Sequence, residues 1–263
     1  PPCLSEPIEA VLFRSFQPGS HLLTLGYSGD PFLGDLPIVN GDLVTLVVTA
    51  PQSTTVVSSS TNPAVYGQSV TWTATARNSG SPASGSIQFK ADGANVGAPQ
   101  PVDPSGNASV SAPPLSVGNH PVSADFASSD PNVVDSNGSL PGGQVVIAAD
   151  TTSNVSSSAS PSDFGAPTTF TASVSVNSPG AGTPTGSVQF QDNGTDLGLP
   201  QSLAGGSQPS VTTSSLSVGS HTISVAFTSN SPNFNGSTGT TTQIVQKART
   251  TLTYDGAVGA DFN

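Results

Sequence analysis

Apolar and polar residues alternate along many short segments of the chain. In the segment VTWTATA, Val70, Trp72, Ala74 and Ala76 share one side, and the threonines between them share the other. A period of two residues is typical of a β-strand that buries one face, and the longer period of an amphipathic helix is absent. The pattern therefore predicts an all-β protein.

Seven strands are predicted between residues 54 and 148. Asp92-Gly93 and, later in the chain, Asn193-Gly194 stand between alternating segments and are strong hairpin-turn signals. Seven short alternating strands in about 100 residues are typical of an Ig-like sandwich. The predicted strands are 54–58, 69–77, 85–91, 94–102, 106–112, 119–127 and 143–148.

The three histidines mark a long repeat. His21, His120 and His221 each follow a glycine by two residues and precede an aromatic residue by six, and they are 99 and 101 residues apart. This period is typical of a complete small β-sandwich and is far longer than the unit of a solenoid. The chain is therefore predicted to be a tandem array of domains.

Two long parts of the chain can be aligned with each other. Residues 60–76 match 158–174, and residues 84–97 match 185–198. The offset rises from 98 to 101 between the two blocks, so the second copy has a three-residue insertion near SPGAGTP, which is predicted to lie in a loop.

The aligned copies share an order of motifs. TTxxxSSxxNPxxxGxxVTFTA is followed by PTGSVQFxDxGxxLG and then by LxxGSHTIxxxFxxxxxFxGS. This order resembles the bacterial Ig-like domain repeats that occur in tandem in large exported and cell-surface proteins. The resemblance covers about residues 50–247 and implies tandem Ig-like antiparallel β-sandwiches of about seven strands each.

Five segments follow from this alignment. The incomplete copies at the two ends match only part of a repeat and cannot close a sandwich alone. The segments are 1–14, a non-repeat segment of different composition; 15–49, the C-terminal part of a truncated Ig-like repeat; 50–148 and 149–247, two complete repeats; and 248–263, the start of a further repeat.

Composition and charge exclude several classes of function. Five Lys and Arg against 16 Asp and Glu give a formal charge of −11, so nucleic acid is not an expected partner, because phosphate binding needs clustered basic residues. No apolar run approaches the roughly 20 residues that span a bilayer, so membrane insertion is not expected. Cys3 is the only cysteine. Repeats without cysteine are typical of exported bacterial proteins, which predicts an extracellular or cell-surface location.

The histidines are predicted to have a structural role. Each lies in phase with the apolar residues that follow it, so its imidazole points with the core face. In Ig-like domains a tyrosine at the entry to this strand commonly bonds back to the upstream backbone. We predict that a ring nitrogen of His21, His120 and His221 donates to a carbonyl of the preceding turn, and that the ring of His221 packs on Leu216.

Metal binding and general-base catalysis are the competing interpretations. Three histidines held in successive domains cannot meet at one zinc ion, and no repeat holds a G-x-S-x-G motif or a second histidine. Asp92, Asp130, Asp192 and Asp196 lack the spacing of a calcium loop and are predicted to be solvated turn residues. No cofactor or metal is expected, although weak calcium binding near Asp150, where domains join, stays open.

The leading hypothesis is a non-enzymatic spacer or display module of an exported bacterial surface or secreted protein. No Gly or Pro lies between Ala148 and Ser158, so the two complete repeats are predicted to sit end to end, with neighbouring Ig-like repeats as the main partners. The alternative is an adhesin or glycan-binding module with a weak glycan or cell-surface ligand. An exposed aromatic cluster would favour that alternative, but nearly every aromatic residue falls in phase with the core.

Overall fold

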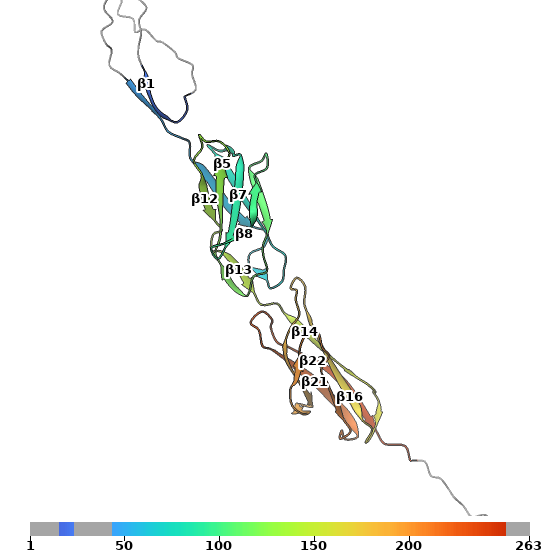
Figure 1. Cartoon of the computed structure of the whole chain (residues 1–263). Coiled ribbons are helices and arrows are strands. Elements are labelled where there is room, and N and C mark those ends of the chain that lie inside the picture. Colours follow the sequence, from blue (N-terminus) through green and yellow to red (C-terminus); the bar gives the residue numbers. More distant parts are fainter. Residues whose placement is uncertain (1–15, 24–43, 251–263) are drawn as a thin grey trace, which may run out of the picture. The chain divides into compact units, whose positions relative to one another are not determined.

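The computed structural model describes residues 16–23 and 44–250, and these residues form β-strands and no helix (Figure 1). The all-β prediction is therefore confirmed. None of the described residues belongs to a helix long and apolar enough to cross a membrane. Contacts divide the chain into two units. The first consists of Pro1–Ser58, Trp72–Val110 and Val122–Pro141. The second consists of Ser59–Thr71, Ser111–Pro121 and Gly142–Asn263.

An antiparallel hairpin comes first in the chain. It consists of β1 (Gly19–Leu23) and β2 (Val44–Val48), with His21 opposite Leu46. This hairpin belongs to the predicted truncated repeat 15–49, and the connection between its strands lies outside the described residues. The predicted non-repeat segment 1–14 and most of 248–263 also lie outside them.

The first unit contains two four-stranded sheets. One has the order β12 (Ser136–Ser139), β11 (Val122–Ser128), β7 (Gly85–Ala91) and β8 (Ala94–Pro101). The other contains β3 (Ser53–Ser59), β5 (Thr71–Asn78) and β6 (Ser81–Pro82), with β9 (Asn107–Ser111) beside β5. Their alternating apolar residues are buried as predicted, and Trp72, Ile87 and Phe89 are at most 1% exposed.

Two predictions about strands in the first repeat need correction. The predicted strand 119–127 is two strands, β10 (Gly118–His120) and β11, because Pro121 between them has no N–H for the ladder. Strand β12 was not predicted at all, since SNGS shows no apolar alternation. A further three-stranded sheet has the order β10, β13 (Gln144–Ile147) and β4 (Ala64–Val65), with β4 parallel to β13.

The second repeat is also built from two sheets. The smaller has the order β14 (Thr151–Ser157), β16 (Thr168–Val176) and β20 (Ser210–Thr213). The larger has the order β15 (Ser162–Asp163), β22 (Ser237–Gln246), β21 (Gly219–Ser229), β17 (Gly186–Asp192) and β18 (Thr195–Asp196), and β19 (Gln201–Leu203) also pairs with β17. Here β21 is continuous, because Thr222 stands where the first repeat has Pro121. Strand β22 is also continuous, whereas in the first repeat the turn at Pro141-Gly142 separates β12 from β13.

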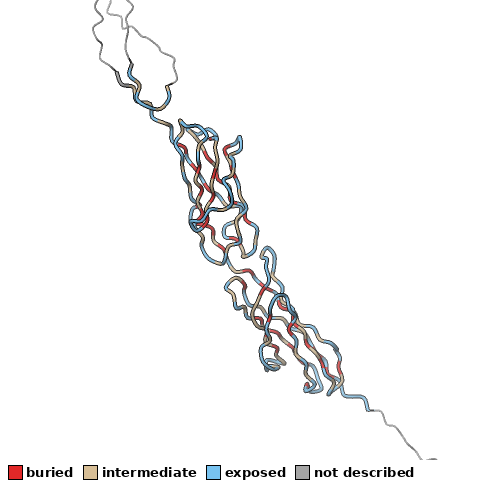
Figure 2. Tube along the Cα trace, in the orientation of Figure 1, coloured by how far each residue is buried: buried red, intermediate tan, exposed pale blue. Residues whose placement is uncertain are grey.

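Aromatic and β-branched residues form the core of the second repeat. Phe170, Phe190, Ile223 and Val225 are fully buried, and Phe227 is 3% exposed. Figure 2 shows buried residues alternating with partly or fully exposed residues along these strands, as a two-residue period requires. Burying each large side chain contributes on the order of 1.5–3 kcal/mol, so these residues supply much of the stability of the repeat.

A fully buried glutamine stands at the same place in each repeat. Gln144 on β13 and Gln243 on β22 are both 0% exposed, in phase with Val146 and Val245. The side-chain oxygen of Gln144 accepts a hydrogen bond from Ser59 Oγ at 2.7 Å, and its Nε2 donates to the Thr61 carbonyl at 3.0 Å. The glutamine therefore holds the segment that leads from β3 to β4.

The second repeat uses the same arrangement. Ser157 Oγ donates to Gln243 Oε1 at 2.6 Å, and Gln243 Nε2 donates to the Ala159 carbonyl at 2.8 Å and to Ser162 Oγ at 3.0 Å. These residues lie where the chain crosses from β14 in one sheet to β15 in the other. The signal for this role in the sequence is a glutamine at a core-phase position in both copies.

We expect Gln243→Leu to destabilise the second repeat by about 2–4 kcal/mol, because it keeps the volume but removes the hydrogen bonds to Ser157 and Ala159 and leaves the buried Ser162 hydroxyl without its partner. Urea denaturation of the full chain measures this change. Gln246→Leu, at an exposed position on the same strand, is the matched control and should change the free energy of unfolding by less than about 1 kcal/mol. Equal effects of the two substitutions would contradict the role of Gln243.

Candidate functional site

All three histidines close a turn in the same way. Each Nε2 lies within hydrogen-bonding distance of the carbonyl oxygen of the residue four positions earlier. The pairs are His21 with Gln17 at 2.6 Å, His120 with Ser116 at 2.9 Å and His221 with Ser217 at 2.8 Å. The local repeat in sequence thus produces a local repeat in geometry.

The surroundings of the histidines differ. His221 is 5% exposed at the start of β21, whereas His21 and His120 are only partly buried. The ring of His21 lies against Phe16, with ring centroids 5.0 Å apart. The imidazole of the second repeat is therefore the one most removed from water.

His221 also has an acidic partner. Its Nδ1 lies 2.9 Å from both carboxylate oxygens of Asp192, and the two side chains are 7% and 19% exposed. The prediction that Asp192 is a solvated turn residue is therefore wrong. Asp192 ends β17 in phase with buried Val188 and Phe190, and this phase was the signal in the sequence that could have found it.

The partners of His221 determine its protonation. A carboxylate and a carbonyl oxygen can only accept hydrogen bonds, so these partners favour the ring form in which both nitrogens carry a proton. Burial alone lowers the pKa of His221, but the hydrogen bond to the Ser217 carbonyl and the hydrogen bond and charge of Asp192 outweigh it. The pKa of His221 is thereby raised above its usual value of 6.5.

This geometry does not suit His221 to act as a general base. Ser217 Oγ lies 3.4 Å from Nε2, but the shorter contact of that nitrogen, at 2.8 Å, is to the Ser217 carbonyl, so Nε2 is engaged by the backbone rather than by the hydroxyl. Among the described residues, no three His, Cys, Asp or Glu side chains are grouped to hold a metal ion. The Asp192–His221 pair can instead fix the start of β21 against the end of β17.

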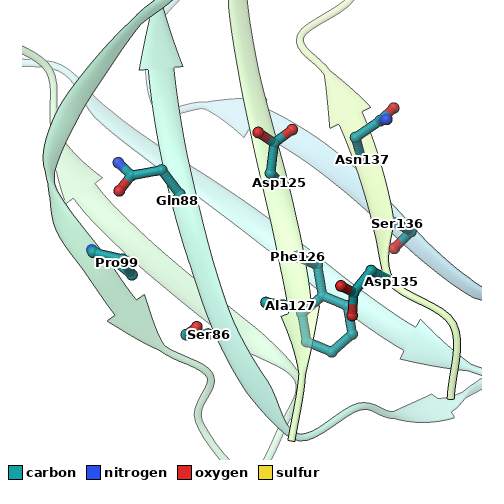
Figure 3. A pocket seen from close by; sticks show the side chains of 9 residues that line it. All are labelled: Ser86, Gln88, Pro99, Asp125, Phe126, Ala127, Asp135, Ser136 and Asn137. Carbon is teal, nitrogen blue, oxygen red and sulfur yellow. The ribbon is translucent and has the colours of Figure 1, made fainter. Parts of the chain in front are cut away.

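An open groove lies on one face of the sheet β12-β11-β7-β8 (Figure 3). It encloses about 360 Å³, and most of the side chains that line it are polar or small. The lining residues are Ser86, Gln88, Pro99, Asp125, Phe126, Ala127, Asp135, Ser136 and Asn137. None of the candidate residues predicted from the sequence lies among them, because polar residues on the outer face of a strand have the pattern of ordinary solvated positions.

A surface ion pair stands beside this groove. Lys90 Nζ lies 2.7 Å from Asp125 Oδ2, and their side chains are 34% and 45% exposed. An ion pair at this exposure contributes at most about 1 kcal/mol to stability. In the second repeat, Gln191 and Ala226 occupy the corresponding register positions, so the pair distinguishes the outer face of the first repeat.

Comparison with known families identifies the repeats. The profile of the bacterial Ig-like domain family, group 3, matches residues 56–141 and 154–246, which together make up more than half of the chain. The chain belongs to this bacterial Ig-like family. The expected resemblance is thereby confirmed for two tandem bacterial Ig-like repeats. No curated protein matches the chain.

Solved structures with similar folds include two bacterial adhesins. One is described as a 1.5-MDa ice-binding adhesin, with 17% identity, a TM-score of 0.32 and coverage of 76% of this chain and 66% of the other. The second is a Ca²⁺-stabilised, ice-binding adhesin of an Antarctic bacterium, with 18% identity, a TM-score of 0.31 and coverage of 76% and 50%. The fibronectin(III)-like modules of Clostridium thermocellum CbhA give 14% identity, a TM-score of 0.30 and coverage of 75% and 99%. The chain thus spans about two thirds of the first adhesin chain and half of the second.

We expect His221→Ala to lower the stability of the second bacterial Ig-like repeat by about 1–3 kcal/mol, because it leaves the Ser217 carbonyl and Asp192 without their partner and opens a small void. Thermal and urea unfolding of the full chain measure the change. A chelator should leave the melting temperature of the wild type unchanged. A melting temperature that fell with chelator, or a variant as stable as the wild type, would contradict the structural role of His221.

The raised pKa of His221 predicts a pH dependence. A histidine whose pKa is raised on folding stabilises the fold fully below its unfolded pKa of about 6.5, and this contribution is lost as the pH rises through the higher folded value. NMR titration of His221 in the full chain should therefore give a midpoint above about 6.5. Asp192→Asn should move the midpoint down and weaken the decline in stability at higher pH. A wild-type midpoint at or below the unfolded value would refute the assignment.

Proposed function

We propose that this chain is a non-enzymatic spacer or display segment of an exported bacterial protein, located outside the cell or on its surface. The observation that supports this most concerns the three histidines, the side chains best able to act as a base or a metal ligand. Each of them lies within hydrogen-bonding distance of a backbone carbonyl of its own turn. In the second repeat the remaining ring nitrogen is also occupied, by Asp192. Histidines that are held in structural hydrogen bonds in this way favour the role of a spacer.

The surface of the described residues also favours spacing over recognition. Binding surfaces are usually centred on exposed aromatic or arginine side chains. Among the strongly exposed large hydrophobic residues, Phe164 is the only aromatic one in the described chain, and Trp72 is fully buried. The exposed aromatic cluster that would favour an adhesin is therefore not present in this part of the chain.

The tandem organisation supports the same proposal. The two family matches fall inside the segments 50–148 and 149–247, which we propose as the complete domains. Each repeat buries its own aromatic core, and the neighbouring bacterial Ig-like repeats of the same chain are the proposed partners. Adhesion through a weak glycan or cell-surface ligand is the second candidate, and the groove of the first repeat is the observation that favours it.

Small-angle scattering of the full chain tests the spacer role. From the sequence, strands of about nine residues span roughly 30 Å, so two repeats placed end to end with their loops should reach about 70–90 Å. We expect a distance distribution with an extended tail. Inserting a Gly/Ser linker after Asp150 is the control and should broaden that tail, because such linkers are flexible. A compact, bell-shaped distribution for the wild type would refute the proposal.

A further inference from the structure

Three planar polar side chains form a row across the outer face of the first repeat. Gln88 on β7 lies opposite Asp125 on β11, and Asp125 lies opposite Asn137 on β12. Neighbouring strands are about 4.8 Å apart, so the row spans roughly 10 Å, about the length of a disaccharide. Figure 3 shows all three side chains at the same open groove, from three adjacent strands.

The row has unused hydrogen-bonding capacity. Asp125 engages Lys90 through Oδ2, and its Oδ1 has no partner among the described residues. Gln88 Nε2 donates to the Phe89 carbonyl at 2.9 Å and also lies 3.3 Å from the Gly97 carbonyl on β8, which leaves its Oε1 to accept. Asn137 is exposed, and its amide has no partner in the described part of the chain. Two acceptors thus stand beside a side chain that can both donate and accept.

The charges around the row disfavour anionic ligands. Lys90 offsets the charge of Asp125, and Asp135, which accepts a hydrogen bond from the Ser128 N–H at 2.7 Å, adds a negative charge at the edge of the groove. A phosphate or carboxylate ligand would meet net negative charge there. A neutral ligand with several hydroxyl groups would not.

We propose that the Gln88–Asp125–Asn137 row is a binding site for neutral carbohydrate. Adjacent sugar hydroxyls donate to Asp125 Oδ1 and Gln88 Oε1 and accept from the Asn137 amide. Pro99 and Ala127, which also line the groove, give apolar contacts for the C–H face of the sugar. Because the groove is open, the affinity is in the millimolar range, about −4 kcal/mol. This activity adds to the proposed spacer role and does not depend on it.

The second repeat provides an internal control. Its equivalent row consists of Gln189, Ala226 and Thr238, which pair in the same register. The carboxylate and the asparagine amide are therefore missing on an equivalent set of strands. It follows that Asp125→Ala and Asn137→Thr place residues in the first repeat that this backbone already accommodates, so these variants should fold.

NMR titration of the isotope-labelled full chain with lactose, cellobiose or N,N′-diacetylchitobiose tests the proposal. We expect at least one sugar to shift the side-chain amide signals of Gln88 and Asn137, with a Kd of about 1–10 mM. Asp125→Ala and Asn137→Thr should each weaken binding at least about tenfold, while the melting temperature stays within a few degrees of that of the wild type. The negatively charged 3′-sialyllactose should bind more weakly than lactose.

Grafting the row into the second repeat is the complementary experiment. The triple variant Gln191→Lys, Ala226→Asp and Thr238→Asn should acquire sugar-dependent shifts at Gln189. The proposal is overturned if none of the three sugars shifts Gln88 and Asn137 below about 50 mM, or if both loss variants bind like the wild type. Tighter binding of sialyllactose would overturn the neutral specificity. None of these results changes the scattering profile, so a failure here is distinct from a failure of the spacer role.

Discussion

A buried amide holds each sandwich together at the point where the chain changes sheets. The crossing removes backbone carbonyls and serine hydroxyls from water, and each of these groups would destabilise the fold if it lost its partner. Gln144 and Gln243 provide the hydrogen-bond partners for these groups, because a glutamine amide accepts and donates at the same time. The parallel pairing of β4 with β13 and of β15 with β22 depends on the segments that these side chains hold.

In each repeat, two strands also approach each other closely. In the first repeat Ser53 and Thr55 on β3 share hydrogen bonds with Ser136 of β12. Gly138 permits this approach, since a Cβ there would lie 2.2 Å from the Thr55 carbonyl oxygen. Gly239 has the same relation to Ser153 in the second repeat, at 2.1 Å. Small hydroxyl residues and glycine therefore close an edge that larger apolar residues would force apart.

The two repeats use one scaffold with different polar groups. The second repeat places an acid–imidazole pair, Asp192 and His221, at the entry of a strand, where it is shielded from water and favours the charged ring. The first repeat places Lys90 and Asp125 on an outer face, where solvent weakens their attraction and leaves one carboxylate oxygen free for other partners. Because an ion pair shielded from water stabilises a fold more than an exposed one, the Asp192–His221 pair stabilises structure. The exposed Lys90–Asp125 pair instead leaves a carboxylate oxygen available to a ligand.

The sequence by itself determined the all-β class, the period of about 100 residues and the residues of the core, because strand alternation and turn dipeptides are local properties of the chain. Trp72 shares the apolar side of its alternating segment with Val70, Ala74 and Ala76, and it is fully buried. The structure alone decided the pairing of Asp192 with His221, the grouping of Gln88 with Asp125 and Asn137, and the existence of β12. These features join residues that are far apart in the sequence, and their partners depend on strand order and register, which alternation along a single strand does not specify.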